Sequence, residues 1–353
     1  MRTPISVGVI GEYHSTDVLA RSFHDLPQAE LRWLCGLDST PPFQLTARYP
    51  SAHISTSVDD LLNDESLDAI AIATPPSTHY ELAKRAIEAD KHVFLEPPLA
   101  LCSDHGEELL RTARRVNRRL IVADRLRFDP ALVRLRRLMT EGYLGEIYYL
   151  TLSRAVAPQN RSTEDILWGV GARELSTLLH AVGDEPVEAV AIGDSYLHPE
   201  ENDVVFCHLR FATGITGRID LSRLEQQERY RLSVVGAQRT VVVDYRETEH
   251  RFTIHEARPR DRWNPDWLRE SDQDNGEIVS VLLPDCDPIP RACAAFLASI
   301  HSTAADSSSE TQAAISVVGV LEALELSLRE RGSLVRVAST PEPVSRVTRL
   351  GSA

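Results

Sequence analysis

The feature that most limits the fold is a set of three short apolar runs near the N-terminus, ISVGVI, LDAIAIA and HVFL. Each run is continuous and rich in β-branched residues, whereas a strand with one solvent-exposed face would alternate apolar and polar residues. Continuous runs suit strands that are buried on both faces, as parallel sheets require. Amphipathic segments that begin at Thr16 and cover 79–89 lie between the runs, and this rhythm is typical of βαβ units. Residues 1–125 are therefore predicted to form a doubly wound parallel sheet of the dinucleotide-binding kind.

The pattern changes at Ile147, where longer strands alternate apolar and polar residues between short glycine-containing turns. Such alternation predicts an antiparallel sheet with one face packed on a core. Helices are predicted at 172–182, 289–302 and 311–331. The second domain, predicted over 126–340, is thus an α/β domain with a large, mostly antiparallel open sheet, and residues 341–353 are predicted to be a frayed tail.

The crossover between the two domains is predicted to be a helix over 130–141. Asp129 is a suitable N-cap, and Pro130 fits the first helical position because its missing N–H has no helical partner there. Arg125 and Arg127 precede this helix at the predicted domain junction. We expect them to form ion pairs between the domains.

The connection over 258–287 is polar and contains Trp263 and Trp267. It is long for a structureless loop in a compact domain. Three interpretations stay open: a mobile flap that covers the cleft, an arm, or a loop that its tryptophans anchor to the core.

Composition limits the partners. The chain has 353 residues, enough for two domains of about 150 residues each. Its net charge of −14 repels phosphate backbones and anionic lipids, so we expect a small-molecule partner, with no nucleic acid and no membrane. The N-terminus has no secretory pattern and no long apolar span follows it, which favours a cytoplasmic protein. No metal site is expected, because the five cysteines are scattered and favour reduced, buried thiols: Cys35, Cys102, Cys207, Cys286 and Cys293.

The segment ATPPSTHYELAKRAIEADKHVFLEPPLA, residues 73–100, resembles the Gfo/Idh/MocA family of oxidoreductases. Further stretches look similar to the same family: RFDPALVRLRRLMTEGYLGEI, FATGITGRIDLS, YRLSVVGAQRTVVVD and VLEALELSLRERGSLVRV. The resemblance implies a Rossmann-type domain that binds NAD or NADP and a sugar or polyol substrate. It also implies a C-terminal sheet that assembles the protein as a homodimer or homotetramer.

The coenzyme motifs of that family are incomplete in this chain. After the first strand only Gly11 remains of the glycine-rich turn, which normally lets backbone N–H groups approach a pyrophosphate. No acidic residue directly follows the second strand, although Asp38 stands nearby and could hold the ribose. NAD, NADP and a lost cofactor site stay open. The resemblance gives these cofactor-binding residues: Gly11, Tyr13, His14, Ser15, Thr16, Asp38, Thr74, Pro75, His79, Glu96 and Pro97.

The Glu-Lys-Pro motif, whose lysine serves the acid–base chemistry in the family, reads Glu96-Pro97-Pro98 here. Proline has no side-chain donor and cannot fill that role. Lys84 and Lys91 are the only lysines of the chain. Lys91 lies at the far end of its strand, and we expect Lys84 to be solvated on a helix.

The family's Asp-x-Gly-x-His-x-x-Asp motif aligns with 169–176, so Arg173 occupies the position of the catalytic histidine. An arginine stays protonated at physiological pH and can bind an anion but not shuttle a proton. Ser176 or Thr177 and His180 share its helix face by spacing. If this face meets the cleft, the catalytic residues are Arg173, His180 and Glu96; alternatively the face is solvated or ion-paired.

Three functions are compatible with these motifs. The first is a divergent NAD(P)-dependent oxidoreductase with a sugar-like or imine substrate; thiazoline imine reductases, a branch of this family, look similar in lacking the lysine and the histidine. The second is an enzyme that works without a cofactor, by elimination, isomerisation or cyclisation. The third is a non-catalytic relative that binds a ligand or a partner subunit. We favour the first.

Overall fold

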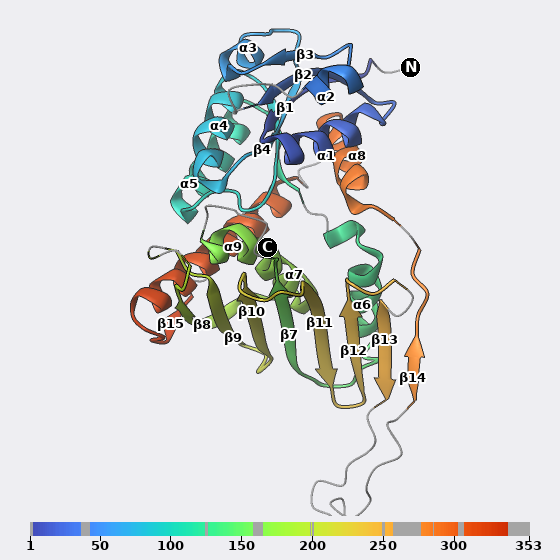
Figure 1. The fold of residues 1–353 in the computed structure, drawn as a ribbon, viewed down its shortest axis with the longest axis vertical. Helices are drawn as coiled ribbons and strands as arrows, with labels where there is room; N and C mark the ends of the chain where they lie inside the picture. Colours follow the sequence, from blue (N-terminus) through green and yellow to red (C-terminus); the bar gives the residue numbers. More distant parts are fainter. Residues whose placement is uncertain are drawn as a thin grey trace, which may run out of the picture.

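The computed structural model describes residues 3–36, 43–123, 126–157, 165–197, 199, 201–248, 251–256, 277–284, 286–302 and 307–337. Several predicted features lie outside this part of the chain: Asp38, Arg125, Trp263, Trp267 and the tail over 341–353. The described residues form two domains, each built on one large sheet (Figure 1).

The first domain contains a six-stranded sheet in which all strand pairs are parallel. Its order is β3-β2-β1-β4-β5-β6. The strands are β1 Ile5–Gly11, β2 Ala29–Gly36, β3 His53–Ser55, β4 Ala69–Ala73, β5 His92–Leu95 and β6 Leu120–Val122. The helices are α1 Tyr13–His24, α2 Phe43–Arg48, α3 Val58–Leu62, α4 Pro76–Glu88 and α5 Ser103–Arg115. This confirms the predicted doubly wound parallel sheet.

The central strands are buried on both faces, as their continuous apolar runs predict. All seven residues of β1 and all five of β4 are buried. Side chains on one face of the sheet join a core with α4 and α5, and those on the other face pack with α1. Because a parallel strand order of this type reverses direction between β1 and β4, the carboxyl ends of these strands border the crevice where such sheets bind ligands.

The second domain contains a nine-stranded sheet of order β14-β13-β12-β11-β7-β10-β9-β8-β15. Its strands are β7 Ile147–Ala155, β8 Pro186–Asp194, β9 Val204–Phe211, β10 Thr216–Ser222, β11 Arg229–Gly236, β12 Arg239–Asp244, β13 Phe252–Glu256, β14 Ile278–Ser280 and β15 Val335–Arg336. Among these strands only β7 and β10 pair in parallel, so the predicted mostly antiparallel sheet is confirmed. Part of the connection predicted as a flap or an arm is the edge strand β14, while residues 257–276 lie outside the described part.

Helices link the two sheets. They are α6 Pro130–Thr140, α7 Ala172–Val182, α8 Pro288–Ile300 and α9 Ser307–Arg329, together with the short turns η1 Leu126–Phe128 and η2 Leu167–Gly171. The α6 helix begins as predicted, because the Asp129 carboxylate accepts hydrogen bonds from the N–H groups of Ala131 and Leu132. The α7 helix ends at Gly183, whose φ of +77° suits glycine.

The domains are not consecutive segments of chain. Helix α8, which the sequence boundaries assign to the second domain, packs against α1 and the first sheet. The Phe296 ring lies 5.3 Å from that of Phe94 and 6.4 Å from that of Phe23. The predicted limits group α8 with the second domain and do not indicate this packing, because an apolar helix pattern does not specify the sheet on which the helix packs.

Helix α9 corrects a second expectation. Its segment Ser309–Arg329 is long and apolar enough to cross a membrane by length and composition alone, so the chain does contain a long apolar span. Half of its most apolar window is buried inside the protein, and the helix packs against α5, β6 and β8. Its hydropathy is thus accounted for by its position between the two domains.

Candidate functional site

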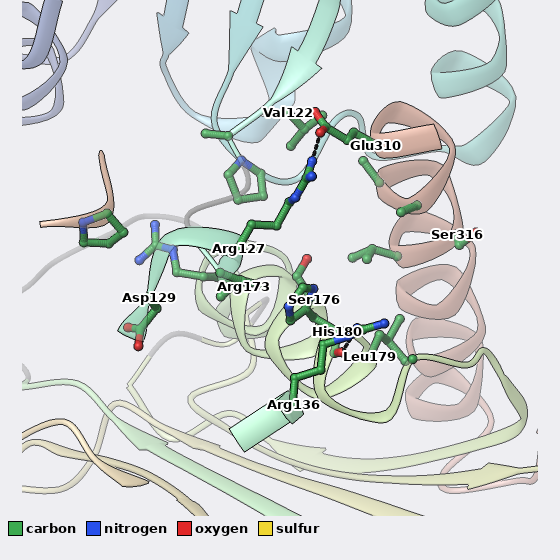
Figure 2. Close-up of a pocket in the computed structure, with 18 of the residues that line it drawn as sticks. Val122, Arg127, Asp129, Arg136, Arg173, Ser176, Leu179, His180, Glu310 and Ser316 are labelled. Atoms are coloured by element: carbon green, nitrogen blue, oxygen red, sulfur yellow. Dashed lines mark hydrogen bonds and ion pairs between the residues drawn. The ribbon is translucent and has the colours of Figure 1, made fainter. Parts of the chain in front are cut away.

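A cavity of about 770 Å³ lies between the domains, at the carboxyl edge of the parallel sheet (Figure 2). Pro97, which follows β5, and Val122, which ends β6, both line this cavity. The other walls come from η1, α6, α7, α9 and the start of α8, and from strand β11 of the second sheet. A volume of this size holds a small organic molecule. The cavity therefore stands where both the first sheet and the domain junction favour ligand binding.

Helix α7 supplies one wall of the cavity. Arg173, Ser176 and His180 line it, spaced by about one helical turn each. Thr177 is buried and its hydroxyl donates to the Arg173 carbonyl at 3.0 Å. The structure thus brings together the α7 residues that the sequence places on one face, and this face meets the cleft rather than solvent.

Three arginines line the cavity, and their neighbours differ. Arg127 forms an ion pair with Glu310 of α9, so the predicted ion pair near the domain junction is present (Figure 2). Arg136 donates to the carbonyl oxygen of His180 at 2.5 Å. The Nε of Arg173 is buried without a hydrogen-bond partner among the described residues. Of these three arginines, Arg173 is therefore the one whose guanidinium has a buried N–H left for a ligand.

A buried polar cluster lies beside α7 and was not predicted from the sequence. Glu174 is 1% exposed, and its Oε1 lies 3.8 Å from Nε of Arg154 on β7. Tyr230 of β11 lines the cavity and is close enough to Glu174 for the two side chains to affect each other's pKa. Burial raises the pKa of Glu174 to about 7, although Arg173 and Arg154 favour its charged form. Burial likewise raises the pKa of Tyr230, which stays protonated at neutral pH.

Two stacked tyrosines extend this cluster along the sheet. The rings of Tyr230 and Tyr245 stack with their centroids 4.2 Å apart. The guanidinium of Arg154 lies 4.6 Å from the Tyr230 ring centre, and that of Arg251 lies 4.6 Å from the Tyr245 ring centre. Arg251 also bonds Asp129 at 2.9 Å. The stack fixes the Tyr230 ring against the cavity wall.

The turn between β1 and α1 forms the expected coenzyme end of the crevice. Gly11 is tightly enclosed, because a Cβ there would lie 2.6 Å from the Ala73 carbonyl oxygen and 2.8 Å from Thr16 Oγ1. This Oγ1 is buried without a partner in the described part of the chain. The N-cap, Glu12, makes no side-chain bond to the helix, and the first turn of α1 carries no acidic residue. Its backbone N–H groups therefore stay available to an anion, which fits the pyrophosphate of a dinucleotide.

The remaining predicted coenzyme residues form the next two loops. His79 is 1% exposed, and its ring nitrogens lie 2.7 Å from the carbonyl oxygens of Thr74 and Pro98. His79 therefore connects the loop after β4 to the loop after β5 through its two ring nitrogens. Pro75 is the N-cap of α4, and Glu96 is half-buried directly after β5, near His79. The side chains of Tyr13, His14 and Ser15 lie outside the described residues.

Both lysines are engaged away from the cavity. Lys84 forms an ion pair with Glu108 of α5 at 2.8 Å and donates to the hydroxyl of Tyr80. Lys91 is buried, and its Nζ donates to the Asp64 carbonyl at 2.7 Å. The chain has no other lysine, so no lysine side chain lines the cavity.

No cysteine is among the described residues that line the cavity. All five cysteines are free thiols; Cys35, Cys207 and Cys293 are buried, whereas Cys102 and Cys286 are partly exposed. Among the described residues no group of three or more His, Cys, Asp or Glu side chains is arranged to hold a metal ion.

The fold and cavity define a two-domain protein with a doubly wound dinucleotide-binding domain. A family model described as an oxidoreductase family with an NAD-binding Rossmann fold matches residues 5–124, and a model of the GFO/IDH/MocA C-terminal domain matches residues 132–242. The chain belongs to the Gfo/Idh/MocA oxidoreductase family.

Relatives with sequence or structural similarity share these domains. The uncharacterised oxidoreductase YrbE of Bacillus subtilis is 25% identical over 233 residues, which cover 63% of this chain and 68% of that one. UDP-N-acetylglucosamine 3-dehydrogenase of Acidithiobacillus ferrooxidans is 27% identical over 190 residues, 54% of this chain and 58% of that one. Its crystal structure aligns over 93% of this chain and 99% of its own, with a TM-score of 0.76 and 21% identity. GenD2 from gentamicin A biosynthesis, crystallised with NAD, aligns over 96% of this chain and 98% of its own, with a TM-score of 0.76 and 20% identity.

Proposed function

We propose that this protein is an NAD(P)-dependent oxidoreductase that reduces a C=O or C=N group in a small sugar-like or imine substrate carrying an anionic group. The observation that carries the proposal is the cavity at the carboxyl edge of the parallel sheet, with Arg173 in its wall. Membership of the oxidoreductase family supports the redox part. The charge of Arg173 supports the anionic part.

The residues around the β1–α1 turn fit the coenzyme. The enclosed Gly11 and the free first turn of α1 would hold its pyrophosphate, and Glu96 after β5 would hold the ribose next to the nicotinamide. When bound, the nicotinamide supplies or accepts a hydride. Glu12 at the N-cap weakens anion binding by repulsion, so we expect a modest affinity for the coenzyme.

Arg173 has the role of binding the substrate and polarising its reacting group. Its guanidinium stays charged, presents several N–H donors and has an unpartnered buried Nε. It can therefore hold a carboxylate or phosphate, but it cannot donate the proton that reduction of C=O or C=N requires. His180, one turn below Ser176, also lines the cavity and is within the same wall (Figure 2). An imine that is already protonated lowers the demand for a proton donor in this site.

Titration of the purified protein with NADH and NADPH, followed by nicotinamide fluorescence, tests the coenzyme. Oxidation of the bound coenzyme is then measured with pyruvate, pyruvate plus methylamine as an imine source, glucose and inositol. We expect binding, and turnover with the anionic carbonyl or imine. Failure to bind either coenzyme refutes the proposal; product formed without coenzyme would point to an eliminase or isomerase, and binding without turnover to a non-catalytic relative.

Arg173→Met tests the anionic part. Loss of a charged hydrogen bond of about 1.5–3 kcal/mol raises KM for pyruvate by about 10- to 100-fold, with the coenzyme dissociation constant unchanged. Arg137→Met is the matched control, because Arg137 lies on the solvent side of α6 and pairs with Glu141. Equal KM values for wild type and Arg173→Met would contradict this role.

We also propose that two copies of the chain associate through the open face of the second sheet. Helices α7 and α9 pack on the opposite face. On the open face, Phe206 is 48% exposed and its cross-strand neighbour Ile192 is 57% exposed. Tyr149 on β7 is exposed on the same side. An exposed apolar patch on a broad sheet supports a self-complementary interface.

A further inference from the structure

His79 of α4 bridges two loops that carry expected coenzyme residues. Its Nε2 lies 2.7 Å from the carbonyl oxygen of Thr74, after β4, and its Nδ1 lies 2.7 Å from that of Pro98, after β5. Both loops lie at the carboxyl edge of the parallel sheet, where such folds bind their ligands. The position of this one ring therefore sets the spacing of the two loops.

The two contacts define the protonation state of the ring that fits between them. A carbonyl oxygen accepts hydrogen bonds and cannot donate them. A neutral imidazole carries a single N–H, so its other nitrogen would direct a lone pair at a carbonyl oxygen 2.7 Å away. Water has no room to relieve this conflict, because His79 is 1% exposed and Thr74 and Pro98 are buried as well. The arrangement therefore fits the imidazolium, which has an N–H at both nitrogens.

His92, at the start of β5, shows the opposite arrangement in the same domain. Its Nδ1 accepts a hydrogen bond from the backbone N–H of Arg119 at 2.9 Å, which requires an unprotonated nitrogen. Burial and the charge of Arg118 lower the pKa of His92 to about 4. His92 thus has a donor for a neighbour and stays neutral, whereas His79 has two acceptors.

The surroundings of His79 leave its charge finely balanced. Burial lowers its pKa, while the two carbonyl groups and the Glu96 carboxylate, which faces it from the loop after β5, favour the charged ring. Its own helix contributes apolar neighbours to the same buried face. Lys84 of α4 and Glu108 of α5 neutralise each other in an ion pair. A further negative charge at this edge, such as a bound pyrophosphate, shifts the balance toward the imidazolium.

We infer that His79 is a positioning residue that joins the two coenzyme loops as an imidazolium, and that binding of the nicotinamide coenzyme is accompanied by uptake of a proton on this ring. The coenzyme part of the inference rests on the proposed reductase function. The protonation state that the two carbonyl contacts require does not depend on that function.

The direction of the pH dependence follows from this coupling. Below the pKa of His79 in the free protein, the ring is charged with and without coenzyme, and the affinity is highest. As pH rises above that value, the free ring loses its proton and binding must restore it. The coenzyme dissociation constant then rises by up to about tenfold per pH unit. Because burial places the pKa of the free ring below 6.5, proton uptake accompanies binding at about pH 7.

Isothermal titration calorimetry with NADH at about pH 7, in two buffers that differ in their enthalpy of ionisation, measures the protons taken up on binding. We expect net uptake by the wild type and none by His79→Gln, whose side chain never carries a charge. The NADH dissociation constant of His79→Gln is at least about 10-fold higher. His92→Gln is the matched control and keeps the wild-type uptake, because it removes the histidine that accepts a hydrogen bond. Equal uptake by the wild type and His79→Gln overturns the inference.

Nitrogen NMR of wild-type protein labelled at histidine observes the ring without turnover. As pH falls through the pKa of His79, we expect its two nitrogens to become similarly protonated and the carbonyl carbon signals of Thr74 and Pro98 to shift with the same midpoint. Saturating NADH moves this midpoint to higher pH.

Two results in these spectra overturn the inference and leave the reductase proposal standing. One is a ring with a single protonated nitrogen in the NADH complex at about pH 7, and the other is a pair of carbonyl signals that do not follow the ring. If NADH does not bind, the reductase proposal and the proton coupling are both refuted, while the titration of the free protein still decides whether the ring and the two carbonyl groups act together.

Discussion

Replacement of Glu174 by glutamine changes the stability of the protein in a pH-dependent way. Glu174 is 1% exposed, and its pKa is about 7 in the folded protein against an ordinary value of 4.5. Below about pH 4.5 the group is protonated in both the folded and the unfolded chain, so its ionisation costs nothing. Between about 4.5 and 7 the folded state binds more protons, and the free energy of unfolding falls as pH rises.

The size of the effect follows from the two pKa values. A difference between 4.5 and about 7 corresponds to about 3 kcal/mol of destabilisation, reached above pH 7, where the carboxylate must be accommodated in the core. Glutamine has nearly the same shape and never ionises. Glu174→Gln therefore gains about 3 kcal/mol relative to wild type on going from about pH 4 to about pH 8.

Thermal unfolding of both proteins from about pH 4 to about pH 8 measures this difference. For domains of this size, about 3 kcal/mol corresponds to a rise of about 6 to 12 °C in the midpoint of Glu174→Gln over wild type at the alkaline end, relative to the acid end. A midpoint difference that does not change with pH would refute the reasoning, because it would mean that Glu174 is ionised throughout or reaches water. The measurement requires neither substrate nor coenzyme.

Two further changes test the fold around the site. Gly11→Ala places a Cβ 2.6 Å from the Ala73 carbonyl oxygen, so the β1–α1 turn must shift. We expect thermal unfolding to show a loss of about 1–3 kcal/mol in the free energy of unfolding, and nicotinamide fluorescence to show at least about 10-fold weaker NADH binding. An unchanged affinity for NADH would contradict the role of this turn. Phe206→Asp puts a charge on the open face of the second sheet. We expect light scattering to show a dimer for the wild type and a monomer for the variant. A monomeric wild type would refute the proposed interface.

The sequence predicts local structure well where a single physical rule decides it. The apolar runs of β1, β4 and β5 have no polar alternation, so only strands covered on both faces can bury them. Helix α6 starts after Asp129, because the carboxylate there satisfies N–H groups that no helix can satisfy internally. The bounds of α7, Ala172–Val182, match the prediction because Gly183 ends the helix.

The sequence does not predict which distant segments of the chain pack or pair with each other. The pattern of α8 predicts a helix but not its position on the first domain, because any apolar stripe can pack on any apolar face. The alternation in β7 and β10 predicts strands but not their parallel pairing, which depends on the order of all strands in the sheet. Glu174 carries no motif, and its position 3.8 Å from Arg154 is visible only once β7 lies beside α7.

The sequence by itself determined the two domain types and the chemistry that is possible at positions 97 and 173, since the side chains of proline and arginine do not shuttle protons in any fold. Only the tertiary structure decided that Arg173 faces a cavity, that both lysines are engaged elsewhere and that Glu174 is enclosed next to Tyr230. The physical reason is that the chemical nature of a side chain is fixed by the residue, whereas its pKa, its partners and its access to a ligand depend on which parts of the chain the fold brings around it.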